Sequence, residues 1–150
     1  MKLTDHFSLE EFACRCGCGA ETDWIEGCRR TAEILEVLRE LINSKEEYHQ
    51  YRNSLPDGSL KELSVTLDCG VRCPKHNAEV GGAPKSKHLS TMYEGAADTW
   101  IPGLPAEKWY EETKGYFRGR ILYLDKNFVN VDRRAGNTYY SVIGQPKEEA

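Results

Sequence analysis

The polar stretch from Ser86 to Asp98 constrains the fold of this chain more than any other part of the sequence. It carries an imidazole at His88 and, ten residues later, a carboxylate at Asp98. A glycine-rich segment at 81–84 precedes it, and small residues at 95–97 come directly before the aspartate. Imidazole and carboxylate groups are ligands of catalytic zinc, which usually has three protein ligands and one position open to water. The alternative is a surface turn with an ordinary histidine, because such a loose spacing is common by chance.

Length and charge narrow the class of protein. A chain of 150 residues is most simply one domain, 1–150, with room for a sizeable core. The net charge of -4 argues against nucleic acid or an anionic membrane as a partner. No apolar run is long enough for membrane insertion. The first residues lack the apolar segment of a signal peptide, so we expect a chain that is cytoplasmic as synthesised.

Six cysteines are many for such a chain. Three of them alternate with glycines in a tight-turn sequence at 14–19, and the others lie further along the chain: Cys28, Cys69 and Cys73. A structural zinc site needs four ligands, which Cys69 and Cys73 could complete. A structural metal, a disulfide and free buried thiols all stay open, because the pairing of cysteines cannot be read from sequence.

The hydrophobic pattern predicts a mixture of helices and strands. Ser8 and Glu11 form a capping-box pattern at the start of a first helix. A long amphipathic helix is expected over 23–45, a short one near Pro74 and another over 105–116. Strands are expected at 63–67, 121–124, 128–131 and 139–143, and the charged tail at 145–150 is expected to fray.

Three segments together carry a family resemblance. The sequence at 7–14 reads FSLEEFAC, that at 71–77 reads VRCPKHN, and that at 81–89 reads GGAPKSKHL. In this order they resemble the zinc D-alanyl-D-alanine carboxypeptidase family, over 7 to about 136. The resemblance implies an α+β fold, a small antiparallel sheet with packed helices, shared with the hedgehog signalling domain. It also implies zinc as the cofactor and a peptidoglycan peptide containing D-amino acids as the partner, cleaved by D,D-carboxypeptidase or endopeptidase action. Release to the cell wall would then need a route other than a signal peptide.

The resemblance also assigns roles to individual residues. His88 and Asp98 take the places of the first two zinc ligands of the family. Arg72 and Ser86 match positions that hold the substrate carboxylate and the developing oxyanion, a task that suits the planar donors of an arginine. The third ligand, a histidine on a late strand of the family, is replaced here by Asn130.

Two departures from the family pattern affect the expected chemistry. Extra residues lie within 90–94, between His88 and Asp98, and could move the aspartate away. The amide of Asn130 is a weak zinc donor, so we expect reduced zinc affinity and less activation of a bound water. The acids available as a general base near the late strand are Asp125 and Asp132.

Three functions therefore compete. The first is a working zinc peptidase, in which Asp132 or a shifted His76 replaces the missing ligand. The second is an inactive relative that binds a cell-wall peptide or a protein without cleaving it. The third is an interaction module whose cysteine cluster binds a structural metal. The family resemblance favours the first two.

Overall fold

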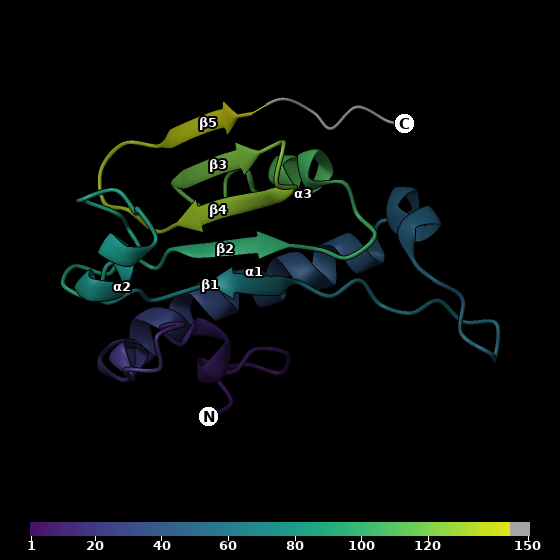
Figure 1. The fold of residues 1–150 in the computed structure, drawn as a ribbon. Coiled ribbons are helices and arrows are strands. Elements are labelled where there is room, and N and C mark those ends of the chain that lie inside the picture. Colours follow the sequence, from purple (N-terminus) through teal and green to yellow (C-terminus); the bar gives the residue numbers. More distant parts are fainter. Residues whose placement is uncertain (145–150) are drawn as a thin grey trace.

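One five-stranded sheet organises the chain in the computed structural model, which describes residues 1–144. The strands lie in the order β1-β2-β4-β3-β5, and their bounds are Thr66–Cys69, Ala97–Trp100, Gly119–Tyr123, Phe128–Asp132 and Tyr139–Ile143 for β1 to β5. The α-helices are α1 (Ile25–Ser44), α2 (Pro74–Glu79) and α3 (Ala106–Thr113), and short 3-10 helices cover Leu9–Phe12, Ala20–Trp24 and Glu46–Tyr51. Helices α1 and α3 cover one face of the sheet, whereas α2 lies beyond its end (Figure 1).

Helix α1 supplies much of the core because its apolar residues recur at helical spacing. Cys28, Ala32, Leu35, Leu38 and Ile42 are fully buried along one face of this helix. They belong to one hydrophobic cluster with the inward side chains of the strands and with Leu9 and Phe12 of the first 3-10 helix. Burial of this stripe, rather than helix propensity, fixes α1 against the sheet.

The pleat of β2 and β4 separates core residues from site residues. Thr99 of β2 and Val129 of β4 are fully buried on the helix side, and Thr99 accepts a hydrogen bond of 2.8 Å from the indole of Trp109 in α3. Because successive side chains of a strand point to opposite faces, Asp98 and Asn130 face away from the helices. The two residues are also direct partners in the antiparallel pairing of β2 with β4.

The predicted α+β class is confirmed, with several local differences. The sheet is antiparallel except at its edge, where β5 pairs with β3 in parallel. The strand expected at 63–67 lies at Thr66–Cys69, and the first helix is a 3-10 turn, in which the Glu11 carboxylate accepts the Ser8 backbone N–H at 2.7 Å. The tail at 145–150 lies outside the described residues. Among the described helices, none combines the length and apolar character needed to cross a membrane.

Candidate functional site

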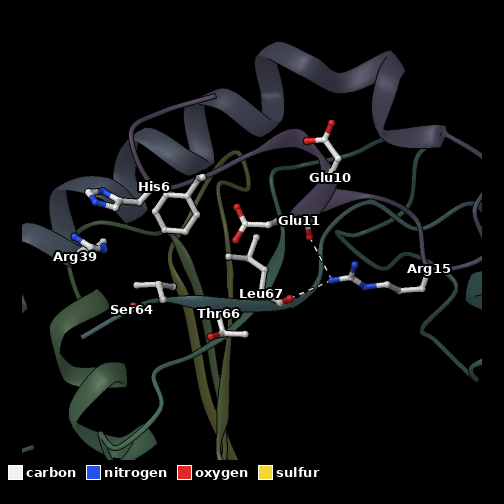
Figure 2. A pocket seen from close by; sticks show the side chains of 10 residues that line it. His6, Glu10, Glu11, Arg15, Arg39, Ser64, Thr66 and Leu67 are labelled. Atoms are coloured by element: carbon white, nitrogen blue, oxygen red, sulfur yellow. Dashed lines mark hydrogen bonds between the residues drawn. The ribbon is translucent and has the colours of Figure 1, made fainter. Parts of the chain in front are cut away.

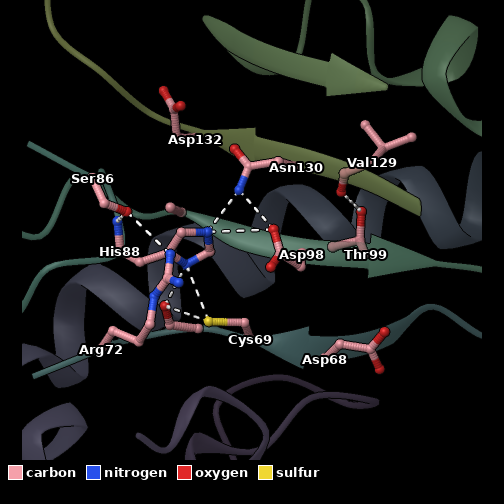
Figure 3. A network of polar contacts seen from close by, with 12 residues as sticks. Asp68, Cys69, Arg72, Ser86, His88, Asp98, Thr99, Val129, Asn130 and Asp132 are labelled. Atoms are coloured by element: carbon pink, nitrogen blue, oxygen red, sulfur yellow. Dashed lines mark hydrogen bonds and ion pairs between the residues drawn. The ribbon is translucent and has the colours of Figure 1, made fainter. Parts of the chain in front are cut away.

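His88 is held rigidly where its segment runs beside the end of β1. The backbone N–H of Arg72 donates to the carbonyl of His88, and the N–H of Ser90 donates to the carbonyl of Arg72, both at 2.7 Å. The imidazole is almost fully buried, and its Nδ1 lies 2.6 Å from the carbonyl oxygen of Gly70 (Figure 3). Because a carbonyl oxygen only accepts, Nδ1 carries a hydrogen and Nε2 is left to face the site. Metal-binding histidines are oriented in this way.

The structure brings together the three residues expected at the zinc position. His88 Nε2 lies 3.3 Å from Asp98 Oδ1, so the extra residues at 90–94 have not moved the aspartate away. The Asn130 amide donates to Asp98 Oδ1 at 2.7 Å, and its nitrogen lies 2.6 Å from His88 Nε2 (Figure 3). A neutral imidazole accepts this amide hydrogen, whereas an imidazolium pairs directly with Asp98.

In the buried pair of His88 and Asp98, each residue favours the charged form of the other. Burial by itself lowers the pKa of His88, but the hydrogen bond and charge of Asp98, assisted by Cys69, raise it to about 10. Burial opposes ionisation of Asp98 as well, yet its hydrogen bond and charge interaction with His88 lower the pKa of this carboxyl. A metal ion at this place therefore has to displace a proton from the imidazole.

The donor set fits zinc in two of its three protein positions. With both ligand bonds at about 2.05 Å, the 3.3 Å separation of His88 Nε2 and Asp98 Oδ1 corresponds to an angle of about 107° at the ion, close to tetrahedral. The Asn130 amide turns its nitrogen toward these atoms, and this nitrogen is not a metal donor. Zinc would thus be held by His88 and Asp98, with Asn130 contributing only after rotation of its amide.

Cys69 is a candidate ligand that sequence reasoning assigned to the cysteine cluster instead. Its sulfur lies 3.5 Å from His88 Nδ1, and a ligand atom of Cys69 is grouped with His88 and Asp98 within 4.8 Å. Cys69 faces Nδ1 of the imidazole, whereas Asp98 faces Nε2 (Figure 3). The sequence signal that could have identified Cys69 as a ligand was its position directly before the segment Gly70–Arg72, which contacts His88. His76 was suggested, besides Asp132, as a replacement for the missing third zinc ligand. It lies on α2, where its ring is 3.8 Å from the Glu79 carboxylate.

Arg72 and Ser86 lie together beside this site. The Arg72 guanidinium donates to the Ser86 hydroxyl at 3.1 Å, and the same hydroxyl lies 3.3 Å from the His88 backbone N–H. Arg72 Nε is buried and has no hydrogen-bond partner among the described residues. A buried donor without a partner is costly, so this arginine is suited to a ligand that supplies an acceptor.

The two acids expected as a general base have different surroundings. Asp132 is fully buried, and both of its oxygens accept hydrogen bonds from the Arg134 guanidinium, at 2.8 and 2.7 Å. Asp132 lines the same groove as His88, whereas Asp125 does not line it. The structure therefore brings Asp132, but not Asp125, to the site.

A groove of about 540 Å³ is lined by the candidate site residues except Cys69, His76 and Asp125. Its cationic side chains are Arg72, Lys85, Lys87, Lys126 and Arg134. Its acids are Asp98 and Asp132, which are already paired with His88 and Arg134. The groove is consequently positive in a chain whose net charge is -4, which favours an anionic ligand. Sequence reasoning missed Lys85, Lys126 and Arg134, because only the fold brings them to one groove.

A second hollow, of about 580 Å³, lies between the N-terminal segment and β1 (Figure 2). Its charged groups serve the chain itself. Arg15 donates to the carbonyls of Leu67 and Glu11, Glu11 accepts from the Ser8 backbone, and His6 pairs with Glu36. These contacts fasten the N-terminal segment to β1 and α1 instead of facing a ligand.

The mixed sheet, the His88–Asp98 pair and the cationic groove fit a domain of the zinc peptidase type. The sequence pattern of the family described as Peptidase M15 matches residues 5–132. The chain therefore belongs to the Peptidase M15 family, and this confirms the family expected from its motifs. Searches of curated proteins and of solved structures each found no match.

Proposed function

We propose that this chain is a zinc peptidase-type domain that acts on D-amino-acid-containing peptides of peptidoglycan through a weakened metal site. The observation that carries the proposal is the pair of His88 Nε2 and Asp98 Oδ1, 3.3 Å apart at the floor of a cationic groove. This pair has the spacing of two ligands of one zinc ion. The groove beside it is lined by cationic and hydroxyl donors that can bind a peptide carboxylate.

Recognition of the peptide rests on Arg72 and Ser86. The unpartnered Nε of Arg72 and its fork of donors suit one terminal carboxylate, and the Ser86 hydroxyl adds a further donor. Stem peptides of peptidoglycan carry several carboxylates, so Lys85, Lys126 and Arg134 around the same groove add long-range attraction. This division of roles predicts that Arg72 determines the position of the carboxylate and the other cations determine the strength of attraction.

When bound, zinc supplies polarisation of the scissile carbonyl and a water of lowered pKa. The chain's own groups provide orientation: Gly70 fixes the imidazole of His88, and Arg72 with Ser86 fixes the peptide. Asp132 is the acid that we propose as the proton acceptor, because it alone of the two expected acids lines the groove. Its ion pair with Arg134 has to loosen before it can take a proton, and this favours slow hydrolysis.

A binding module without hydrolysis is the second candidate, and one observation favours it. The Asn130 amide nitrogen lies 2.7 Å from Asp98 Oδ1 and 2.6 Å from His88 Nε2, so it occupies the position between the two residual ligands. In this case the groove would retain the peptide and leave its bonds intact.

Mass spectrometry of muropeptides distinguishes the two candidates. Purified protein is incubated with D-Ala-D-Ala-terminated stem peptides, with and without added zinc, and binding is measured on the same samples. Zinc-dependent loss of a D-amino acid that is abolished in His88→Ala supports the peptidase. Binding without cleavage supports the module, and equal binding of D- and L-terminated peptides that is insensitive to Arg72→Ala would refute both.

A further inference from the structure

We propose that the chain binds a structural zinc ion, separate from the His88 site, through the four thiols of Cys14, Cys16, Cys18 and Cys73. Their sulfur atoms all lie within 4.8 Å of one another. Within the described residues these four cysteines are all free, and Cys14 is buried whereas Cys16 and Cys18 are exposed. The proposal does not depend on the function assigned to the groove.

The sulfur geometry matches a tetrahedral zinc site. Zn–S bonds of about 2.3 Å place the sulfurs of such a site about 3.8 Å apart. The Cys14 and Cys16 sulfurs lie 3.4 Å apart, and those of Cys16 and Cys73 lie 3.6 Å apart. One disulfide would use two of these thiols and leave the other two beside it, whereas one zinc ion uses all four.

The turn that carries three of the cysteines is fixed by other residues. Gly17 and Gly19, which follow Cys16 and Cys18, have φ values of 82° and 79°, a conformation that glycine adopts without strain. Arg15 donates to the carbonyls of Asp68 and Leu67, at 3.0 and 3.1 Å, and Figure 2 shows the bond to Leu67. This side chain fastens the turn to β1. The ligand geometry is therefore organised by the fold.

Backbone donors also point at the sulfurs. The Cys73 N–H donates to the Cys14 sulfur, and the His76 N–H at the start of α2 donates to the Cys73 sulfur, both at 3.4 Å. Such bonds stabilise thiolate, which is the form that binds zinc. Cys28 and Cys69 lie outside this group: Cys28 is buried in the core, and Cys69 lies against His88.

The proposed ion would join distant parts of the chain next to the groove. It connects the turn at 14–18 to Cys73, which directly follows Arg72. A metal that joins Cys18 to Cys73 closes a long loop, and this closure removes much conformational freedom from the unfolded chain. The same link would hold Arg72 in place relative to His88, since these two residues already share a backbone hydrogen bond of 2.7 Å.

Metal analysis and cobalt substitution of the full chain test the proposal. We expect about one zinc per chain to survive mild chelation in the native protein and in His88→Ala. Replacement by Co²⁺ should give the sulfur-to-cobalt charge-transfer absorption and the intense visible bands of a tetrahedral thiolate site. Both signals should be lost in Cys16→Ser and Cys73→Ser, and retained in the matched controls Cys28→Ala and Cys69→Ser.

The cobalt spectrum of the native chain keeps the test decisive even if a variant fails to fold. Absence of the thiolate absorption in native protein prepared under reducing conditions would overturn the proposal. So would zinc that is lost in His88→Ala, or thiolate absorption that persists unchanged in both Cys16→Ser and Cys73→Ser.

Discussion

Replacement of Asn130 by histidine should tighten zinc binding at the His88 site by about 100-fold or more. In the native protein the Asn130 amide donates one hydrogen bond to the neutral form of the His88 ring, which is the form that binds zinc, and one to the Asp98 carboxylate. Hydrogen bonds of these kinds contribute about 1 and about 2 kcal/mol respectively, and zinc has to break both. At 1.4 kcal/mol per tenfold, their loss weakens zinc binding by roughly 100-fold, about 3 kcal/mol in total.

Asn130→His removes this competition and adds a second imidazole, as the third ligand, opposite two ligands that already subtend a near-tetrahedral angle. Asn130→Ala is the matched control, because it removes the competing amide without adding a ligand. We therefore expect zinc affinity to rise from native protein to Asn130→Ala, and again from Asn130→Ala to Asn130→His.

Isothermal titration after mild chelation measures these affinities, and binding that disappears in His88→Ala is assigned to this site. The reasoning is refuted if Asn130→His binds zinc no more tightly than Asn130→Ala, since position 130 would then not face the ion. Tight zinc in the native protein, lost in both His88→Ala and Cys69→Ser, would show instead that Cys69 fills the third place.

Three further predictions concern recognition, packing and pH. Arg72→Ala should weaken binding of a carboxylate-terminated peptide about tenfold or more, and Arg72→Lys should restore only part of it because a lysine lacks the planar fork; calorimetry checks this. Thr99→Val leaves the buried indole N–H of Trp109 unpaired, so thermal unfolding should shift down by several degrees, from a loss of about 1–3 kcal/mol that Thr99→Ser avoids. Burial raises the pKa of Glu36, but hydrogen bonds from His6 outweigh burial and lower this pKa below 4.5. The stability that the ionised Glu36 contributes is therefore present above about pH 4.5 and is lost as the pH falls below that value. Denaturant unfolding of Glu36→Gln should accordingly vary less with pH below about 4.5 than that of the native protein.

Local sequence patterns were enough to predict most elements of the fold. The apolar spacing of α1, the proline that begins α2 and the β-type runs of β3 to β5 each carry their own signal, because burial of one face needs a matching period. The strand β1 was displaced by a few residues, since its ends depend on pairing with β2. The parallel pairing of β5 with β3 was not predicted, because partners of an edge strand are chosen by tertiary contacts.

For the candidate site, the sequence identified residue types and the structure decided their partners. The motifs alone determined the family and pointed to His88, Asp98 and Asn130, but no strand was expected at 97–100, so the pairing of Asp98 with Asn130 came from the structure. Only the tertiary structure separated Cys69 from Cys73: the bulged end of β1 takes Cys69 to the imidazole of His88, whereas the start of α2 takes Cys73 to the N-terminal cysteines. These residues are four apart in the chain, but their environments depend on which distant segments pack against each of them, and no local pattern encodes that choice.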